Sequence, residues 1–310
     1  MAHKRGGKKP VFDILYKIPG KLAMKELGKY FKYEDGDIWF VETDRNNMKL
    51  EYRAKELISS VKSPFQQIDI VDLYDFGKCL VLDGAIQSTV LDGHIYNEMI
   101  SHIPIVTHDN PQDVLIIGGG DCGVANEVLK YEEVKKVDFV EIDELVVKEC
   151  VEHIPEIAGT TSQDNRVNFI FTDGVKFVED KKNLYDVILV DSSDPVGPAV
   201  QLFSREFYQN AKNCLKEDGI MVCQSQSPLF NKDILRNTHK ILNELYPIVR
   251  TYYAIVPSYP GGIWSFTLAS LKNDPLEVDV MKLKTNTKYI NEGVFQSCFK
   301  LPNMFKYVLE

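Results

Sequence analysis

Residues 114–123 read VLIIGGGDCG, and this stretch decides which fold the chain can adopt. An apolar run without polar alternation is typical of a strand buried on both faces of a parallel sheet. Gly118, Gly120 and Gly123 then follow at the spacing G-x-G-x-x-G, which brings the backbone close to a ligand when it joins a strand to a helix. We therefore expect a buried strand that ends in a ligand-binding turn and continues into a helix.

Downstream of this stretch, strand patterns and helix patterns alternate. Strands are expected at 134–143, 167–174, 185–191, 220–226, 249–257 and 262–270, and helices at 121–131, 144–155, 205–219 and 231–247. Gly219 is expected to end the helix at 205–219. Strands that alternate with helices predict βαβ units and a doubly wound parallel sheet that is covered on both faces.

Upstream, the pattern is that of a β-rich domain. Aromatic and β-branched residues, separated by short turns, predict strands at 37–42, 65–74 and 78–84. A helix is expected at 92–104, with Pro104 ending it. The predicted fold class is α/β, with a flexible or helical extension at 1–35, a small N-terminal β domain at 36–110 and a larger Rossmann-like domain at 111–310.

Composition narrows the range of possible partners. The 310 residues carry a formal net charge of −9, whereas a protein that binds nucleic acid usually presents a basic face, so we expect no nucleic-acid partner. No apolar run approaches the length of a membrane span, and the six cysteines form no C-x-x-C pair. The basic N-terminus is not followed by the apolar segment of a signal peptide. We therefore expect a cytoplasmic protein with no membrane partner and no metal.

Acidic residues lie at the strand ends where an open α/β sheet binds its ligands. Glu141 ends the second strand, the position from which an acid binds ribose hydroxyls. Asp121 lies in the glycine turn, where it would repel a pyrophosphate and favour a cationic amine or sulfonium; alternatively, it only caps the helix. Asp173-Gly174, after the third strand, is either a helix cap with a turn or a contact to an adenine amino group.

The segment DVILVDSSDPVGPA at 186–199 ends a buried strand in two acids, Asp191 and Asp194. Two neighbouring carboxylates repel each other unless a cation or hydrogen bonds compensate. We interpret this pair as a site for a substrate amine. The alternative interpretation is an exposed turn with two solvated acids.

Taken together, these stretches resemble the spermidine synthase family, the polyamine aminopropyltransferases. The matching segments are YNEMISHIP (96–104), VLIIGGGDCG (114–123), VEID (140–143), YDVILVDSSDPVGPA (185–199), LFSREFYQNAKNCLKEDGIMVCQ (202–224), YPGGIWSF (259–266) and KYINEGVFQSCFKLPNMF (288–305). The resemblance implies a β domain followed by a Rossmann-like catalytic domain. It also implies transfer of the aminopropyl group of decarboxylated S-adenosylmethionine to a diamine such as putrescine, which gives spermidine and methylthioadenosine.

The resemblance further implies a role for each matching residue. Asp191 matches the catalytic acid; Gln66, Gly118, Gly120, Asp121, Glu141, Asp173 and Gly174 match the donor site; Tyr96, Asp194, Tyr259 and Gln226 match the acceptor site. The family uses no metal and no cofactor, because decarboxylated S-adenosylmethionine is a co-substrate. Its members form homodimers or homotetramers through the N-terminal region.

Some positions depart from the family's usual pattern. Cys122 replaces a glycine, Gly93 and Asn97 stand where many members have an acidic residue and His or Gln, and Gln226 stands where bacterial members often have Glu. Because two acids near the acceptor pocket are lost, the acceptor stays open: putrescine is the first expectation, and cadaverine, agmatine and spermidine are alternatives. A SAM-dependent amine N-methyltransferase, a nicotinamide-dependent oxidoreductase and a non-catalytic polyamine-binding protein are the remaining alternatives.

Overall fold

The computed structural model describes residues 28–45, 47–195, 197–284 and 286–310. Most of the expected N-terminal extension at 1–35 therefore lies outside the described residues. Its described end does not belong to an extension, because strand β1 (Phe31–Glu34) pairs with β2 (Asp37–Asp44) in the first sheet. That part of the prediction is wrong, and the sheet begins before residue 36.

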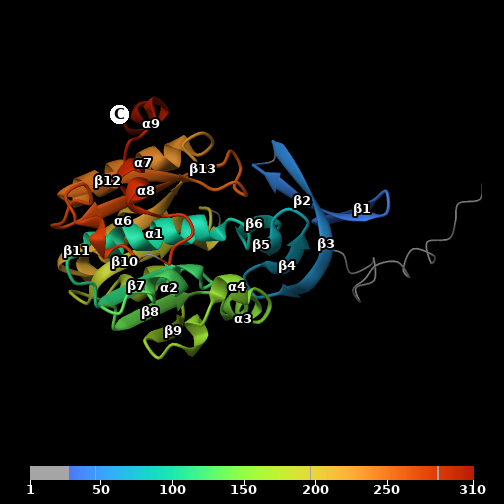
Figure 1. Ribbon diagram of the computed structural model, residues 1–310, viewed down its shortest axis with the longest axis horizontal. Coiled ribbons are helices and arrows are strands. Elements are labelled where there is room, and N and C mark those ends of the chain that lie inside the picture. Colours follow the sequence, from blue (N-terminus) through green and yellow to red (C-terminus); the bar gives the residue numbers. More distant parts are fainter. Residues whose placement is uncertain (1–27, 46, 196, 285) are drawn as a thin grey trace, which may run out of the picture.

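The first sheet is an antiparallel meander in which each strand pairs with the next along the chain. After β1 and β2 its strands are β3 (Met48–Lys62), β4 (Gln67–Leu73), β5 (Gly77–Leu82) and β6 (Ala85–Thr89). Strands β2, β4 and β5 confirm the expectations at 37–42, 65–74 and 78–84. The long strand β3 was not predicted, although polar and apolar residues alternate along its first half. In Figure 1 this sheet stands beside the larger domain.

The second sheet has the order β12-β13-β11-β10-β7-β8-β9. Its strands are β7 (Asp113–Gly118), β8 (Lys136–Glu141), β9 (Val167–Phe171), β10 (Tyr185–Asp191), β11 (Leu215–Gln226), β12 (Ile248–Ile255) and β13 (Ile263–Ser270). Strands β7 to β11 run parallel, and β13 is antiparallel to both β11 and β12. The α/β fold class is confirmed, and the expected parallel sheet is confirmed for β7 to β11. That expectation is wrong for β12 and β13, whose antiparallel pairing makes the sheet mixed.

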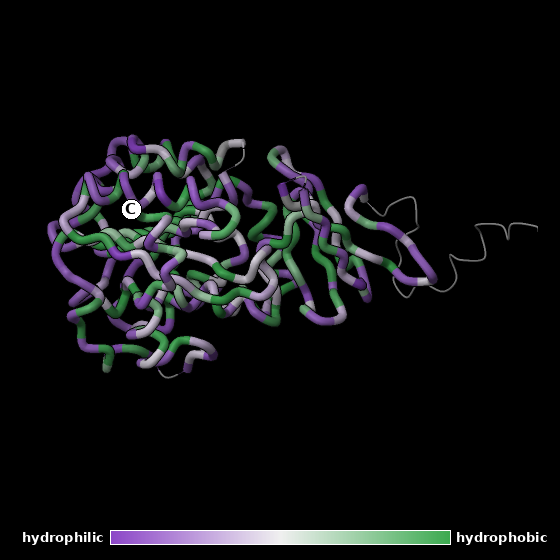
Figure 2. Tube along the Cα trace, turned by 90° about the horizontal axis from the view of Figure 1, so that it is seen from above, coloured by the Kyte–Doolittle hydropathy of each residue, from purple (hydrophilic) through white to green (hydrophobic). Residues whose placement is uncertain are grey.

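Central strands of this sheet are buried on both faces, as their continuous apolar runs predict. In β10, Val187 and Leu189 pack into one core, whereas Ile188 and Val190 pack into the other. Figure 2 shows the resulting concentration of hydrophobic residues along the interior strands of the larger domain. Two separate apolar layers thus hold the sheet between its helices.

Helices cover both faces of the second sheet. They are α1 (Gly93–Thr107), α2 (Gly123–Val128), α3 (Glu144–His153), α4 (Pro155–Ala158), α5 (Gly174–Val178), α6 (Arg205–Cys214), α7 (Lys232–Leu245), α8 (Glu292–Ser297) and α9 (Asn303–Leu309). Helices α1, α2 and α8 contribute to one core, and α5, α6 and α7 contribute to the other. This is the doubly wound arrangement that alternating strands and helices predict.

Two predicted helix ends are wrong. Pro104 lies inside α1, which continues to Thr107 because the Pro104 carbonyl still accepts a hydrogen bond from His108 N. Proline lacks an N–H, so the helix loses one bond there, but the buried residues around Pro104 hold the last turn in place. Helix α6 ends at Cys214 rather than at Gly219, because Leu215 already pairs with Tyr185 of β10.

Helix α1 packs on the second sheet, although it falls within the segment 36–110 expected for the N-terminal domain. The chain therefore passes from the first sheet to the larger domain between β6 and α1. A shared apolar cluster joins the two parts: Ile68 and Ile70 of β4 pack against Val146, Cys150 and Ile154. The first sheet thus rests against the α3 side of the larger domain.

Candidate active site

Strand order reverses between β7 and β10. From β7 the chain adds β8 and β9 on one side, and it then returns to add β10 on the other side of β7. In open α/β sheets the crevice at the carboxyl ends of such strands binds ligands. Asp191, the last residue of β10, pairs in register with Gly118, the last residue of β7. Gly119 N donates to the Asp191 carbonyl at 2.9 Å, so the glycine turn and the Asp191 strand end form one unit.

Gly118 at the end of β7 and Gly119 in the turn after it leave no room for a side chain. Gly118 and Gly119 both adopt positive φ angles, +83° and +73°, which favour glycine. A Cβ on Gly118 would lie 2.1 Å from the Asp191 carbonyl oxygen, and one on Gly119 would lie 2.8 Å from Asp191 Oδ2. The glycines therefore let the turn approach the Asp191 carboxylate closely.

Asp121 is buried, Asp191 is half-buried, and the two acids influence each other. Tyr96 of α1 donates its hydroxyl proton to Asp191 Oδ1 at 2.6 Å. The pKa of Asp191 is raised to about 8. Burial is the largest cause, and the charge of the nearby Asp121 adds to it, whereas the hydrogen bond from Tyr96 lowers the pKa. Burial also raises the pKa of Asp121, whose Oδ1 accepts from Gly123 N at 2.9 Å at the start of α2. Asp121 thus makes the helix-capping contact and also lies in the acidic cluster.

A second acidic position lies on the far side of the glycine turn. Glu141 ends β8, its Oε1 accepts from Asp143 N at 3.0 Å, and burial raises its pKa to about 7. A Cβ on Gly120 would lie 3.3 Å from Glu141 Oε2. Gln66 reaches this place from the first sheet, since its Nε2 donates to Asp143 Oδ2 at 3.0 Å.

Asp173 and Gly174 lie at the carboxyl end of the neighbouring strand β9. Asp173 is the N-cap of α5, and its Oδ1 accepts from Val175 N at 2.9 Å. A Cβ on Gly174 would lie 2.5 Å from Ile117 Cγ2, so this glycine allows α5 to approach β7. The helix-cap interpretation of Asp173 is confirmed, and the contact to an adenine stays a prediction.

Aromatic side chains form a wall beside Asp191. The rings of Tyr96 and Tyr259 lie edge to face at 5.9 Å, and Tyr259 packs on Trp264 at 4.6 Å. The Tyr259 hydroxyl donates to the Gln87 carbonyl at 2.7 Å. Burial raises the pKa of both tyrosines well above its ordinary value, so both remain neutral hydrogen-bond donors.

Asp194 lies on the exposed loop that follows Asp191 and β10. Its side chain accepts a hydrogen bond from Gln226. Gln226 ends β11 and is completely buried; its Nε2 donates to Asp194 Oδ1 at 2.8 Å. Gln224 holds the loop between the two acids, since its Nε2 donates to the Ser192 carbonyl at 3.1 Å. The structure therefore gathers the expected donor-side and acceptor-side residues around the ends of β7, β8, β9, β10 and β11.

Comparison with known proteins agrees with this geometry. The family models described as "Spermine/spermidine synthase domain" and "Spermidine synthase tetramerisation domain" match residues 93–280 and 38–89. A polyamine aminopropyltransferase of Caldicellulosiruptor saccharolyticus is 44% identical over 275 residues, which are 88% of this chain and 99% of that protein. One of Methanocaldococcus jannaschii is 48% identical over 268 residues, 84% of this chain and 91% of that protein.

This chain belongs to the spermine/spermidine synthase family. It is a polyamine aminopropyltransferase of the spermidine synthase type, and the resemblance seen in the sequence is confirmed. Among solved structures, spermidine synthase in complex with the transition state analogue AdoDATO has a TM-score of 0.86 at 35% identity, covering 92% of this chain and 99% of that chain. Spermidine synthase of Thermotoga maritima has a TM-score of 0.82 at 34% identity with the same coverage.

Several residues that support this aminopropyltransferase site were missed in the sequence. Asp143 accepts from both Ser63 and Gln66 and so ties the first sheet to the Glu141 position. Asp92 accepts from Ser258 N at 2.7 Å and so fixes the loop that carries Tyr259. Asp143 could have been found from its position two residues after Glu141, but Asp92 has no local signal that points to residue 258.

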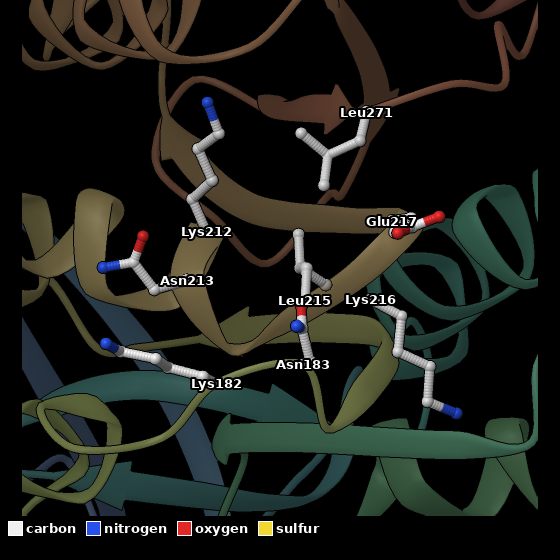
Figure 3. A pocket seen from close by; sticks show the side chains of 8 residues that line it. All are labelled: Lys182, Asn183, Lys212, Asn213, Leu215, Lys216, Glu217 and Leu271. Carbon is white, nitrogen blue, oxygen red and sulfur yellow. The ribbon is translucent and has the colours of Figure 1, made fainter.

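The amino ends of the strands hold features that lie away from this site. A cavity of about 370 Å³ there includes Lys182, Lys212 and Lys216 in its lining, and Figure 3 shows their ammonium groups pointing in different directions. His108 lies near Asp186 and Asp218, with 3.5 Å between its Nε2 and Asp218 Oδ1. Within the described residues, no helix has the length and apolar character needed to cross a membrane.

Proposed function

We propose that this enzyme transfers the aminopropyl group of decarboxylated S-adenosylmethionine to a primary amine of putrescine, with spermidine and methylthioadenosine as products. The observation that carries the proposal is the pair of neighbouring acids beside the glycine turn, the buried Asp121 and the half-buried Asp191. Two neighbouring acids with raised pKa values are stabilised in their ionised form by a bound cation, so this crevice favours cationic ligands. The two substrates supply such cations, an aminopropyl ammonium and a diamine.

Asp121 supports the choice of donor. Its carboxylate lies in the turn where a dinucleotide would place a pyrophosphate, and it would repel that group. It would equally repel the carboxylate of S-adenosylmethionine, whereas it would attract the ammonium of the decarboxylated donor. We assign Gln66, Gly118, Gly120, Glu141, Asp173 and Gly174 to the remainder of the donor site, with Glu141 at the ribose and Asp173 at the adenine.

Asp191 supports the chemical step. An alkylamine has a pKa of about 10, so forming the free amine at neutral pH costs roughly 4 kcal/mol. In the transfer, the amine nitrogen forms a bond to the carbon next to the sulfonium, the carbon–sulfur pair returns to sulfur, and Asp191 accepts the proton from nitrogen. A carboxylate with a pKa near 8 is better matched to this proton than an ordinary aspartate. Tyr96 keeps Asp191 oriented through its hydrogen bond.

The acceptor would extend from Asp191 toward Asp194, along Tyr96, Tyr259 and Gln226. No metal or cofactor is needed for this reaction, because the sulfonium is already an activated leaving group. We also propose that the enzyme works in the cytoplasm as a homodimer or homotetramer. The match of residues 38–89 to a tetramerisation domain supports assembly through the first sheet.

The proposal is tested by an end-point assay with mass spectrometry. Decarboxylated S-adenosylmethionine is offered with putrescine, cadaverine, agmatine or spermidine in separate reactions, and S-adenosylmethionine serves as the control donor. Methylthioadenosine together with spermidine is the expected result. A different aminopropylated product would correct the acceptor alone, whereas methylation from the control donor, or no product with any amine, would overturn the proposal.

The role of Asp191 is tested separately with Asp191→Asn, which keeps the size of the side chain and removes the base. We expect kcat to fall at least 100-fold, since a positioned base contributes about 10² to 10⁴ in rate. Asp233→Asn, on the exposed start of α7, is the matched control and should keep wild-type turnover. Wild-type turnover in Asp191→Asn would show that the assignment is wrong.

A further inference from the structure

Gln226 connects Asp194 to a residue outside the expected site. While its Nε2 donates to Asp194 Oδ1, its Oε1 accepts from Nδ2 of Asn231, which precedes α7. The side chain of Gln226 is restricted to these contacts because it is completely buried. Its backbone lies at φ +70°. The backbone carbonyl oxygen of Gln226 also accepts a hydrogen bond from the Ser265 hydroxyl at 2.6 Å, which fixes the backbone.

Asn231 in turn faces a residue of the first sheet. Arg45, in the turn between β2 and β3, places its Nη1 3.5 Å from Asn231 Oδ1. Its guanidinium also lies over the ring of Phe230, 4.1 Å from the ring centroid. The loop that joins β11 to α7 is therefore held between the acceptor side of the site and the first sheet.

The order of donors and acceptors along this chain of contacts is set by its two ends. An ionised carboxylate such as Asp194 only accepts, and a guanidinium such as Arg45 only donates. Gln226 must therefore turn its NH₂ toward Asp194, which leaves its oxygen for Asn231. Asn231 must then donate with Nδ2 and turn its own oxygen toward Arg45. Reversing either amide would place oxygen against oxygen or N–H against N–H.

We propose that Asn231 and Arg45 are positioning residues that orient Asp194 through Gln226, so that the first sheet contributes to binding of the acceptor amine. This inference rests on the proposed function, in which Asp194 binds that amine. Held through Oδ1, the Asp194 carboxylate keeps its second oxygen in a fixed direction. Without Asn231 the Gln226 oxygen loses its donor. Only the contacts of Gln226 Nε2 to Asp194 Oδ1 and to Gln224 Oε1 (3.2 Å) then hold the amide.

The first test is Asn231→Leu, which keeps the approximate volume and removes the donor without a change in charge. Asn231 makes no side-chain cap hydrogen bond to α7, so the helix loses no cap. We expect the acceptor KM to rise about tenfold, with kcat and the donor KM changed less than threefold. Asn237→Leu, an exposed position on the same helix, is the matched control and should behave as wild type.

The second test uses Arg45→Met, for which two physical effects predict opposite changes in the acceptor KM. Removing a positive charge near the site should by itself attract a cationic acceptor and lower its KM. Loss of positioning should raise the acceptor KM, and we expect a rise of about threefold. Arg53→Met removes an arginine on β3 that bonds Asp37 instead, and it should leave the acceptor KM unchanged.

A double variant separates action through Gln226 from a general effect on folding. In a Gln226→Met background, adding Asn231→Leu should cause no further rise in acceptor KM. Additive effects, equal changes in both KM values, or an unchanged acceptor KM in Asn231→Leu would overturn the inference. Turnover of the wild type in the same assay decides the proposed function: an inactive wild type overturns both, whereas an active wild type with unaffected variants overturns this inference alone.

Discussion

Asp191 shows at the scale of one residue how the site is prepared for a cation. It is half-buried and lies near the buried Asp121, and both acids have raised pKa values. Buried like charges destabilise a protein unless a cation or a proton neutralises them. In the ligand-free enzyme protons serve this purpose near neutral pH. A bound ammonium can replace them, and substrate binding is then coupled to proton release.

The pKa of Asp191 predicts the pH dependence of catalysis. Below pH 8 the free enzyme carries Asp191 mainly in the protonated form, which neither binds an ammonium nor accepts a proton. We therefore expect kcat/KM for the acceptor to rise about tenfold per pH unit up to an inflection near 8, because this ratio reports the free enzyme. The measurement is a set of initial rates between pH 6 and 9.

Two variants check that this inflection belongs to Asp191. Asp121→Asn should move the inflection to lower pH, since the Asp121 charge helps to raise the pKa of Asp191. Tyr96→Phe should move it to higher pH, because the Tyr96 hydrogen bond lowers that pKa. An inflection that stays in place in both variants would assign it to another group.

Cys122, which stands in the ligand-binding turn, is predicted to be chemically inert. Its side chain is completely buried, and burial raises the pKa of its thiol, so little reactive thiolate forms. All six cysteines are free and buried. We expect less than one thiol per chain to react with Ellman's reagent in the native enzyme, and six after unfolding. Rapid reaction of one thiol that is lost in Cys122→Ser would contradict this.

Residues at strand ends were predictable because position in a doubly wound sheet determines what they face. Asp191, Asp121 and Glu141 were placed near one crevice from the order of strands alone. Asn231 and Arg45 were not, since the contact between them joins residues 186 positions apart and depends on how two domains pack. Local sequence carries no signal for such a contact.

At the scale of elements, the β7 turn is the most sterically constrained part of the site. Gly118 combines a positive φ with a close approach to the Asp191 carbonyl, whereas Gly262 has φ +71° and open space around it. Both would lose the backbone freedom of glycine on replacement by alanine, at a cost of about 1–2 kcal/mol. Only at Gly118 would the new methyl group also collide with backbone.

We therefore expect Gly118→Ala to lower the melting temperature far more than Gly262→Ala does. Gly262→Ala should cost about 1–2 kcal/mol, from backbone strain alone. Gly118→Ala must in addition push β7 and β10 apart, and we expect it to abolish turnover or folding. Differential scanning fluorimetry of both variants is sufficient. Equal melting temperatures would show that the close approach at Gly118 is absent in solution.

Elements themselves were predicted well where periodicity was clear and poorly where tertiary contacts overrule local signals. Gly219 signalled a helix end, but pairing of Leu215 with β10 starts strand β11 four residues earlier than that glycine. Pro104 signalled another end, but packing of α1 on the sheet extends the helix past it. Both residues have the expected local effect, and in both places buried contacts outweigh it.

At the scale of the whole molecule, the first sheet and the α3 region of the larger domain share one apolar cluster. Ile68 and Ile70 of the first sheet pack with Val146, Cys150 and Ile154 of the larger domain. Loss of either part would expose this surface, which costs roughly 25 cal/mol per Å². We therefore expect a single cooperative transition in calorimetry. Ile70→Ala should lower its temperature without splitting it, and two separate transitions would contradict the expectation.

The contact of Gln66 with the larger domain limits how this enzyme can be altered in evolution or in the laboratory. Gln66 extends from the first sheet to Asp143, two residues after Glu141, while Arg45 extends from the same sheet to the loop after β11. The first sheet thus contacts, through two separate turns, residues next to both of the substrate positions that we propose. A homologous N-terminal sheet transplanted onto this catalytic domain would carry its own assembly surface, but it would also retune both substrate affinities. Under the proposed assignment, quaternary structure and substrate preference are therefore not free to change independently.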